Sequence, residues 1–406
     1  MFSDELESIR ERWGHLAGPA RERRLAEDPG RPTVEHNLAG VAFSGGGIRS
    51  ATINLGLSQA LYDAGIFDYF DYMSTVSGGG YLGSSISATM RRRVSPTSEI
   101  AGVVGIENRP GGERHVTVSD LSSGASRHYA FPATVELAVA AGDRVRPGDR
   151  LVQRSELHAH SGDTTQMERQ GPAKNPESFV VRFDWRVRPW ALLREICGDL
   201  QDRARWVNLS DGGHLENLGV MELLRRRCRL IVAGDGESDP KYAFGALATL
   251  MRTAEIDLGV EIEIFLDDLR LRPREQLPEG RIAEEQLPAA HFAIGRILYP
   301  GDGGPGYLIY VKSSVTGDEN AIISEYRECS PSFPNESTAD QFFTEDQFEA
   351  YRLLGIHIGE KLKLALLPSQ NGIPLHFSDL VRACESQFKE AEAMSTSAKV
   401  SESTSA

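Results

Sequence analysis

The chain has 406 residues, and at roughly 150 residues per domain this length predicts two or three folding units. Lysine and arginine number 44 against 58 aspartate and glutamate residues, so the net charge of −14 excludes a general electrostatic attraction to polynucleotides, and no nucleic-acid partner is expected. The composition, 40% hydrophobic and 25% charged, is typical of a globular protein. Its one excess is glycine, with 40 of 406 residues, or about 10%, against the usual ~7%.

Three features of the chain predict a cytoplasmic location, with peripheral membrane contact at most. The first residues are charged and lack the apolar core of a signal peptide. No apolar run approaches the ~18 residues of a membrane span. The four cysteines are spread singly, a pattern that favours reduced thiols over disulfides or a zinc knuckle: Cys197, Cys228, Cys329 and Cys384.

Residues 1–97 begin with a polar segment and continue as an α/β layer. Residues 1–37 read as a short polar helix and a linker. An apolar strand at 38–43 then precedes a glycine turn and a helix at 50–64, and the same order recurs as a strand at 70–76, a turn and a helix at 81–93. Strands that alternate with helices in this way predict a parallel sheet.

Residues 98–165 have a different hydrophobic pattern, which predicts a small β-barrel or β-sandwich insert. Helical patterns are absent, and short alternating stretches lie between turns. The sequence AGDRVRPGDRL at residues 141–151 resembles the turn pattern of lipoyl and biotinyl domains and of sandwich-barrel modules in RNA polymerase. No modifiable lysine follows in a hairpin, so the insert is expected to be structural or to dock a protein partner.

The alternation of strands and helices continues over residues 166–390. Together with residues 38–97 they form one predicted core. A strand at 206–209 precedes the turn Asp211-Gly212-Gly213, and a helix follows at 218–227. Later strands are expected at 230–233, 262–266, 292–298 and 307–312, and a helix around residues 342–354. Residues 391–406 are rich in serine, threonine, alanine and glutamate and are predicted to be disordered.

The first glycine turn, Gly45-Gly46-Gly47, offers backbone N–H groups at the start of a helix. Such groups suit an anion or a developing oxyanion. The Walker lysine of a phosphate-binding loop is absent, because Arg49 and Ser50 follow, and Ser50 stands where a dinucleotide fingerprint needs glycine. A turn that only packs closely remains the alternative.

The second turn places Ser77 between a strand and a helix, in the position of a nucleophile elbow. There the N–H of Gly78 can also face an oxyanion. Thr75 stands where the usual pattern has its first glycine, and the glycines at 78–80 are expected to relieve the crowding. A serine that caps the helix is the alternative interpretation.

The third turn supplies Asp211, which at a strand end can accept the hydroxyl proton of Ser77. Asp235, after the next strand, is a competing carboxylate, and His214 is a competing base. For each of them the alternative is an ordinary turn or cap residue. The three turns are expected to meet at the carboxyl edge of one sheet, where open α/β sheets bind ligands.

The ordered triplet GGGIR, serine elbow and DGG resembles the patatin-like phospholipases, whose catalytic core is related to that of the cytosolic phospholipases. The motifs SDGGHLENLG at residues 210–219 and FPNESTADQFF at residues 333–343 are similar to those of a bacterial branch of that family. The resemblance covers roughly residues 38–94 and 178–363. It implies a three-layer α/β hydrolase core with a mostly parallel sheet, carrying a small all-β insert.

For the site, the resemblance implies a Ser-Asp dyad without a catalytic histidine. Ser77 would be the nucleophile and Asp211 its base, the amides of Gly45, Gly46 and Gly47 would form the oxyanion hole, and Arg49 would steady that loop or a lipid phosphate. The expected activity is hydrolysis of phospholipid or lysophospholipid esters, with release of fatty acid. The alternative is a catalytically weak lipid- or partner-binding protein that docks a partner through residues 98–165.

No cofactor and no metal are expected. The pair His158 and His160 offers only two ligands on the insert, which makes a poor metal site.

Overall fold

The computed structural model of the chain describes residues 2–15, 31–94, 101–109, 113–120, 126–132, 137, 139–146, 151, 212–271, 287–367 and 376–405. The strand expected at 206–209, Asp211, His158, His160 and Cys197 lie outside the described residues.

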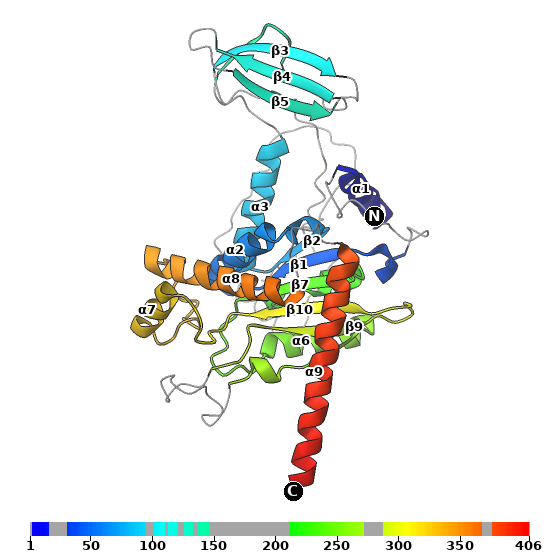
Figure 1. Cartoon of the computed structure of the whole chain (residues 1–406), viewed down its shortest axis with the longest axis vertical. Helices are drawn as coiled ribbons and strands as arrows, with labels where there is room; N and C mark the ends of the chain where they lie inside the picture. The colour runs from blue at the N-terminus through cyan, green and yellow to red at the C-terminus, as the bar shows by residue number, and fades with distance from the viewer. Residues whose placement is uncertain are drawn as a thin grey trace, which may run out of the picture.

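The core of the molecule is a six-stranded sheet in the order β2-β1-β7-β10-β9-β8 (Figure 1). Four neighbouring strands run parallel: β2 (Tyr72–Thr75), β1 (Ala39–Phe43), β7 (Leu230–Asp235) and β10 (Gly306–Lys312). The last two strands pair antiparallel with their neighbours. β9 (Phe292–Leu298) is antiparallel to β10, and β8 (Glu261–Ile264) is antiparallel to β9. The sheet is therefore mostly parallel, as the sequence predicts.

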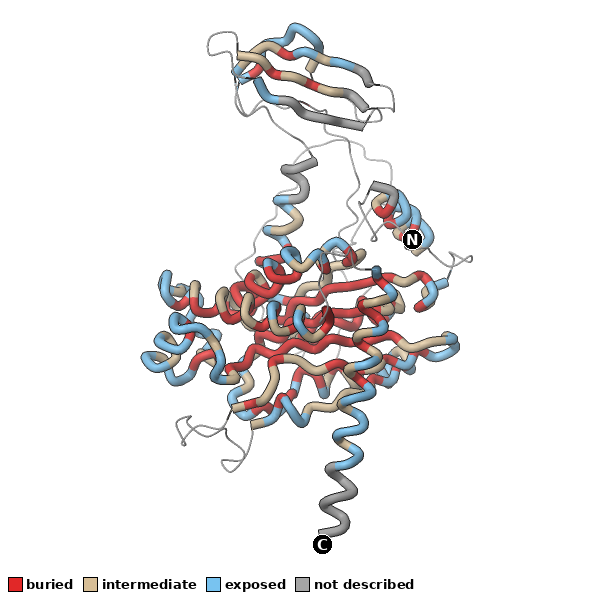
Figure 2. The backbone as a smooth tube through the Cα atoms, viewed as in Figure 1, coloured by how far each residue is buried: buried red, intermediate tan, exposed pale blue. Residues whose placement is uncertain are grey.

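Helices cover both faces of this sheet, so the core has three layers. Alternate residues of each central strand point to opposite faces because side chains alternate along a strand: Val41 and Phe43 join one apolar cluster and Ala42 the other. The first cluster is shared with α2 (Gly47–Asp63), α8 (Glu345–Leu366) and the start of α9 (Phe377–Ser405), and the second with α1 (Phe2–His15), α5 (Met221–Arg225) and α6 (Gly245–Leu258). Figure 2 shows buried residues concentrated along the central strands.

A second, antiparallel sheet lies apart from the core at the far end of α3 (Gly78–Val94) (Figure 1). Its strand order is β5-β4-β3-β6, and its strands are β3 (Gly102–Arg109), β4 (Glu113–Ser119), β5 (Ser126–Pro132) and β6 (Arg144–Val145). Val116, Val118 and Leu151 are fully buried in a small core of its own. The separate all-β module is thus present, and its closure into a barrel or sandwich stays a prediction.

The polar interpretation of the first residues is incomplete. Leu6, Ile9 and Trp13 lie on one face of α1, at the spacing of an amphipathic helix, and are buried in the second apolar cluster. The indole N–H of Trp13 donates to Asp71 Oδ1 at 2.7 Å, and Arg12 forms an ion pair with the same carboxylate. This segment therefore packs against the core instead of only flanking it.

The expected disordered tail is wrong, because α9 continues as a helix to Ser405. Its first half is fixed by buried side chains, among them Leu380, Cys384 and Phe388. Extending an existing helix adds one hydrogen bond per residue without a new nucleation cost, and the alanine, glutamate and lysine residues of this segment favour helix.

The sequence also leaves two helices unpredicted, α6 and α7 (Ala321–Cys329). Expectation and structure agree on Cys228 and Cys384, which are buried free thiols, while Cys329 is exposed. Among the described residues, the structure contains no helix with the length and apolar character needed to cross a membrane.

Candidate active site

Three of the loops that the sequence singles out lie at one edge of the sheet. Since β1, β2 and β7 run parallel, their carboxyl ends share that edge. Ser44 follows β1, Val76 follows β2, and Asp235 ends β7. The register pairs Phe43 with both Thr75 and Gly234, so the three strands end side by side. The first two predicted turns therefore follow neighbouring parallel strands, as expected. The strand expected before the third turn lies outside the described residues, so the meeting of all three turns stays a prediction.

Ser77 is the residue directly before α3, and it has a backbone conformation that side chains seldom adopt. Its φ is +46°, in the left-handed region, and its side chain is exposed. A non-glycine residue in this region costs of order 1–3 kcal/mol, and such strain clusters at functional sites. The hydroxyl is therefore presented to solvent by a sharp strand-to-helix turn, which is the geometry of a nucleophile elbow.

The two residues after Ser77 must be glycine because the first glycine turn passes directly against Gly78 and the end of β1 against Gly79. A Cβ at Gly78 would lie 2.6 Å from the amide nitrogen of Gly47, and one at Gly79 would lie 2.7 Å from the carbonyl carbon of Phe43. Real Cβ contacts are not this short. The elbow and the Gly45–Gly47 turn are thus in backbone contact.

The substitution of Thr75 for the usual glycine is accommodated by a glycine other than those predicted. A Cβ at Gly83, one turn into α3, would lie 2.7 Å from Thr75 Cγ2, whereas Gly80 faces Thr75 at 3.8 Å. Gly78 and Gly79 serve the contact with the first turn. It is mainly Gly83 that makes room for Thr75.

The first glycine turn presents two backbone amides without a partner. Gly46 and Gly47 have φ of +141° and +62°, and neither N–H donates a hydrogen bond to any described residue. The N–H of Gly78 is likewise without an acceptor among the described residues. Because Gly47 and Gly78 are in contact, these amides lie next to the residue that carries the exposed hydroxyl.

The predicted part of Gly45 in the oxyanion hole is wrong. Its N–H donates to the backbone oxygen of Asn217 at 2.8 Å and is not available to a ligand. This bond joins the first glycine turn to the loop that follows Asp211. The sequence could not show it, since 172 positions separate the two residues.

Buried hydroxyls hold the first turn in shape. Ser50 Oγ donates to the backbone oxygen of Ser44 at 2.6 Å, and the N–H of Gly236 donates to Ser44 Oγ at 2.8 Å. Ser50 is fully buried, and a Cβ at Gly236 would lie 2.6 Å from its Cα. The departure at Ser50 from the dinucleotide fingerprint is therefore a structural feature that ties the loop after β1 to the loop after β7.

Arg49 steadies the loop and does not face solvent. It is 2% exposed, its Nε donates to the backbone oxygen of Gly236 at 2.9 Å, and its Nη1 donates to the backbone oxygen of Glu336. Burial lowers the pKa of Arg49. Of the two roles expected for this residue, the loop-supporting one agrees with these contacts, and attraction of a lipid phosphate does not.

Asp211 lies outside the described residues, but the residue after it is placed beside the elbow. A Cβ at Gly212 would lie 3.7 Å from Val76 Cγ1, and Val76 directly precedes Ser77. A Cβ at Gly219, at the end of the same loop, would lie 3.4 Å from Val76 Cγ2. The loop 212–219 thus passes over the end of β2.

A buried carboxylate that the sequence analysis did not single out organises this loop. Glu216 is 5% exposed, and its two oxygens accept four consecutive backbone N–H groups at the start of α5: Leu218, Gly219 (3.1 Å), Val220 (2.7 Å) and Met221 (3.3 Å). Burial raises the pKa of Glu216, against the opposing effect of these bonds. An acidic residue shortly before a helix start is the one signal that could have revealed it.

Asp235, the competing carboxylate, is saturated. It is 2% exposed, and its Oδ2 accepts from Tyr310 Oη at 2.5 Å and from Lys312 Nζ at 2.8 Å. Its Oδ1 accepts from the N–H of Glu237 at 2.8 Å. Lys312 is itself 1% exposed, so Asp235 and Lys312 form a buried ion pair. His214, the competing base, is exposed on the loop 212–219.

Three exposed apolar side chains lie on segments that adjoin the elbow or the first glycine turn, and we call them the apolar rim: Tyr81, Leu215 and Phe342. Tyr81 is 69% exposed on α3, one turn after Ser77. Leu215 is 64% exposed, and its N–H donates to Gly212. Phe342 is 94% exposed and follows Gln341, whose Oε1 accepts from the N–H of Ile48 at 3.3 Å.

No protein-family model and no curated protein matches the chain. Among solved structures, human GIVD cytosolic phospholipase A2 is similar, with a TM-score of 0.44 and 11% identity over 95% of this chain and 66% of that chain. Its complex with methyl gamma-linolenyl fluorophosphonate matches with a TM-score of 0.37 and 11% identity over 97% of this chain. The chain spans 64–66% of the length of these structures.

Proposed function

We propose that this protein is a serine acyl hydrolase that cleaves ester bonds of phospholipids or lysophospholipids. The observation that carries the proposal is the strained, exposed Ser77 at the strand-to-helix turn. Its neighbour Gly78 is in backbone contact with a loop in which the N–H groups of Gly46 and Gly47 have no acceptor among the described residues. A serine that only capped α3 would need neither the left-handed conformation nor the close approach of the Gly45–Gly47 turn.

In the proposed reaction, Ser77 Oγ attacks the ester carbonyl carbon while Asp211 accepts the hydroxyl proton. The negative charge that develops on the carbonyl oxygen is stabilised by the N–H groups of Gly46, Gly47 and Gly78. One well-placed donor of this kind contributes about 3 kcal/mol to catalysis. The leaving alcohol takes the proton from Asp211, and an acyl-serine remains.

Water then attacks the acyl-serine, with Asp211 again accepting a proton. The fatty acid leaves, and the hydroxyl of Ser77 is restored. Support for Asp211 comes from its neighbour Gly212, which contacts Val76 at the elbow, and from the saturation of the alternative carboxylate, Asp235.

The apolar rim supports a lipid substrate. Exposed aromatic and aliphatic side chains beside a nucleophile suit an acyl chain or the surface of a lipid aggregate, because contact removes apolar area from water at about 25 cal/mol per Å². The net charge of −14 gives no general attraction to anionic lipid. Contact with the substrate is therefore proposed to be mainly apolar.

Labelling with a fluorophosphonate probe tests the proposal. The wild-type protein is expected to be labelled and to hydrolyse lysophospholipid, while Ser77→Ala does neither and keeps its melting temperature. Ser84→Ala, at an exposed position on the same helix, is the matched control and should label like the wild type. A folded wild-type protein without labelling, or equal labelling of Ser77→Ala, would exclude the assignment.

A further inference from the structure

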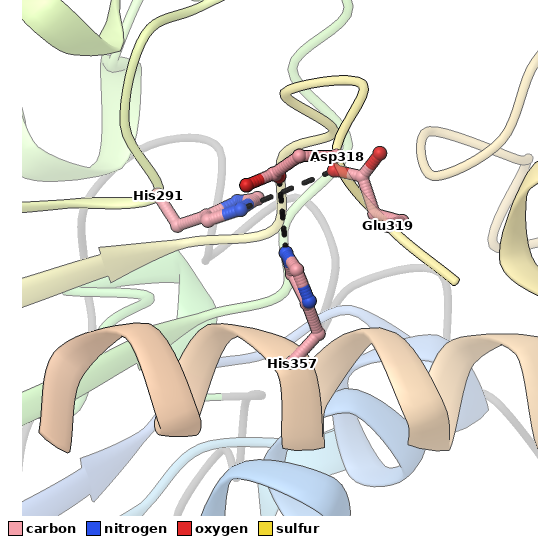
Figure 3. A group of neighbouring side chains, drawn as sticks. All are labelled: His291, Asp318, Glu319 and His357. Carbon is pink, nitrogen blue, oxygen red and sulfur yellow. Dashed lines mark hydrogen bonds and ion pairs between the residues drawn. The ribbon is translucent and has the colours of Figure 1, made fainter. Parts of the chain in front are cut away.

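A second group of chemically active side chains lies at the same sheet edge, around the loop after β10. In the sheet, β10 is two strands from β1 and three strands from β2. It consists of His291, Asp318, Glu319 and His357, whose ligand atoms all lie within 4.8 Å of one another. Figure 3 shows them converging from three parts of the chain: the residue before β9, the loop after β10 and the middle of α8. None of them belongs to the proposed dyad.

His291 is positioned as a ligand by its surroundings. It is 3% exposed, and its Nδ1 lies 3.1 Å from the backbone oxygen of Ser314. Nδ1 also lies 3.0 Å from Ser314 Oγ, a hydroxyl that can donate or accept. In the tautomer that donates from Nδ1 to the carbonyl, the lone pair of Nε2 faces the two carboxylates. Metal-binding histidines are oriented by this kind of bond from the second ring nitrogen.

Glu319 is a buried carboxylate without a lysine or arginine partner among the described residues. Its side chain is 2% exposed, and its one ion-pair contact there is His291 Nε2 at 4.0 Å. Its other close donors are uncharged: Oε1 accepts from the N–H of Thr316 at 2.6 Å, and Oε2 accepts from the N–H of Gly317 at 2.8 Å. A buried carboxylate is costly unless a cation balances it.

One hydroxyl group lies at the centre of the group, within hydrogen-bond distance of three of its polar atoms. Thr316 Oγ1 lies 2.6 Å from Asp318 Oδ1, 3.1 Å from His291 Nε2 and 3.2 Å from Glu319 Oε1. One hydroxyl hydrogen can serve only one of these three acceptors at a time. Lys361 neutralises part of the charge from outside, at Asp318 Oδ2, 2.5 Å away.

We propose that these four side chains bind a divalent transition metal of the zinc class. Two imidazoles with two carboxylates form a ligand set that suits Zn²⁺ better than Mg²⁺ or Ca²⁺. With metal–ligand bonds of about 2.1 Å, a tetrahedral site needs ligand atoms about 3.4 Å apart. Two pairs of ligand atoms bracket that value, with 3.2 Å for His357 Nε2 to Asp318 Oδ1 and 4.0 Å for His291 Nε2 to Glu319 Oε1.

The bound metal would have a structural role. It would join α8 to the sheet edge, and α8 packs so closely on α2 that a Cβ at Gly355 would lie 2.9 Å from the amide of Leu57. Four protein ligands leave no open position for substrate, as in closed structural zinc sites. The site is therefore independent of the proposed ester hydrolysis.

The proposal is tested by calorimetric titration of the full, metal-stripped chain with Zn²⁺, together with its melting temperature. The wild type should bind one Zn²⁺ per chain and melt higher with it, and Mg²⁺ should give no saturable binding. His357→Ala and Asp318→Asn should each weaken Zn²⁺ binding more than about tenfold. Glu349→Gln, two turns earlier on α8 and paired with Arg352, is the control and should bind like the wild type.

A third variant separates metal binding from simple charge balance. Lys361→Met removes the cation at Asp318 Oδ2, so the Zn²⁺ affinity should stay equal or rise. Absence of saturable Zn²⁺ binding to a wild type that is folded by circular dichroism would overturn the proposal. Equal binding by His357→Ala, Asp318→Asn and the wild type would do so too, because the ion would then be held elsewhere.

Discussion

The ends of β2 and β7 lie at the same edge of one sheet, yet their polar groups are in opposite states. At β2, Ser77 is exposed and strained, and the neighbouring amides of Gly47 and Gly78 lack acceptors among the described residues. At β7, Asp235 is buried and accepts from Tyr310, Lys312 and Glu237.

The contrast shows why position at the edge is not enough to assign a role. A catalytic group must keep unused bonding capacity that a transition state can take up. A carboxylate whose lone pairs are already occupied by a buried lysine and a tyrosine stabilises the fold instead. Two aspartates at strand ends can thus look alike in sequence and differ in function.

The largest effect that separates the two ends is expected for Asp211→Asn. An amide cannot accept the proton of Ser77, so ester hydrolysis should fall about 10²- to 10⁴-fold. The melting temperature should stay close to that of the wild type. Steady-state hydrolysis of a lysophospholipid measures the first quantity, and retention of more than half the activity would contradict the proposed base.

Asp235→Asn should act on stability at the other end. Without the carboxylate, the charge of Lys312 stays buried, and breaking such a pair costs about 3–5 kcal/mol of unfolding free energy. Urea unfolding measures it. The double variant Asp235→Asn with Lys312→Met should recover part of the loss, because the unpaired charge is gone. An Asp235→Asn protein that is stable but inactive would make Asp235 the base.

Gly78→Ala should damage the contact between elbow and glycine turn. The new Cβ would lie 2.6 Å from the amide nitrogen of Gly47, so the turn must shift and its donors with it. A decrease in kcat of about 10²- to 10³-fold is expected, the cost of one oxyanion donor. Gly245→Ala is the control, since nothing lies within 4 Å of its Cβ position. Unchanged kcat in Gly78→Ala would exclude the proposed oxyanion site.

Glu216→Gln should have the smallest effect. A glutamine has one acceptor oxygen for four N–H groups, so about 1–3 kcal/mol of stability should be lost. Thermal or urea unfolding measures the change. Glu222→Gln, a half-buried position on α5 whose carboxylate pairs at the surface with Arg225 and Arg226, should lose less than about 1 kcal/mol. Equal stability of the two variants would show that Glu216 does not hold the loop.

Local pattern was sufficient for most of the central sheet. The apolar strands at 38–43, 230–233, 292–298 and 307–312 appear as β1, β7, β9 and β10, because a strand buried on both faces is a nearly continuous apolar run. The position of Ser77 at a strand-to-helix turn followed from the same reasoning. The predicted disordered tail failed because composition does not reveal that a preceding helix is anchored.

What the sequence by itself determined is the order of elements, the excess of glycine at the turns and the candidate residues at strand ends. Tertiary structure alone decided which of these groups keep free bonding capacity. The amide of Gly45 meets Asn217, Arg49 is turned inward to Gly236, and Asp235 meets Lys312. Each of these contacts joins residues far apart in the chain, and hydrogen-bond saturation depends on distance in space, which no local pattern encodes.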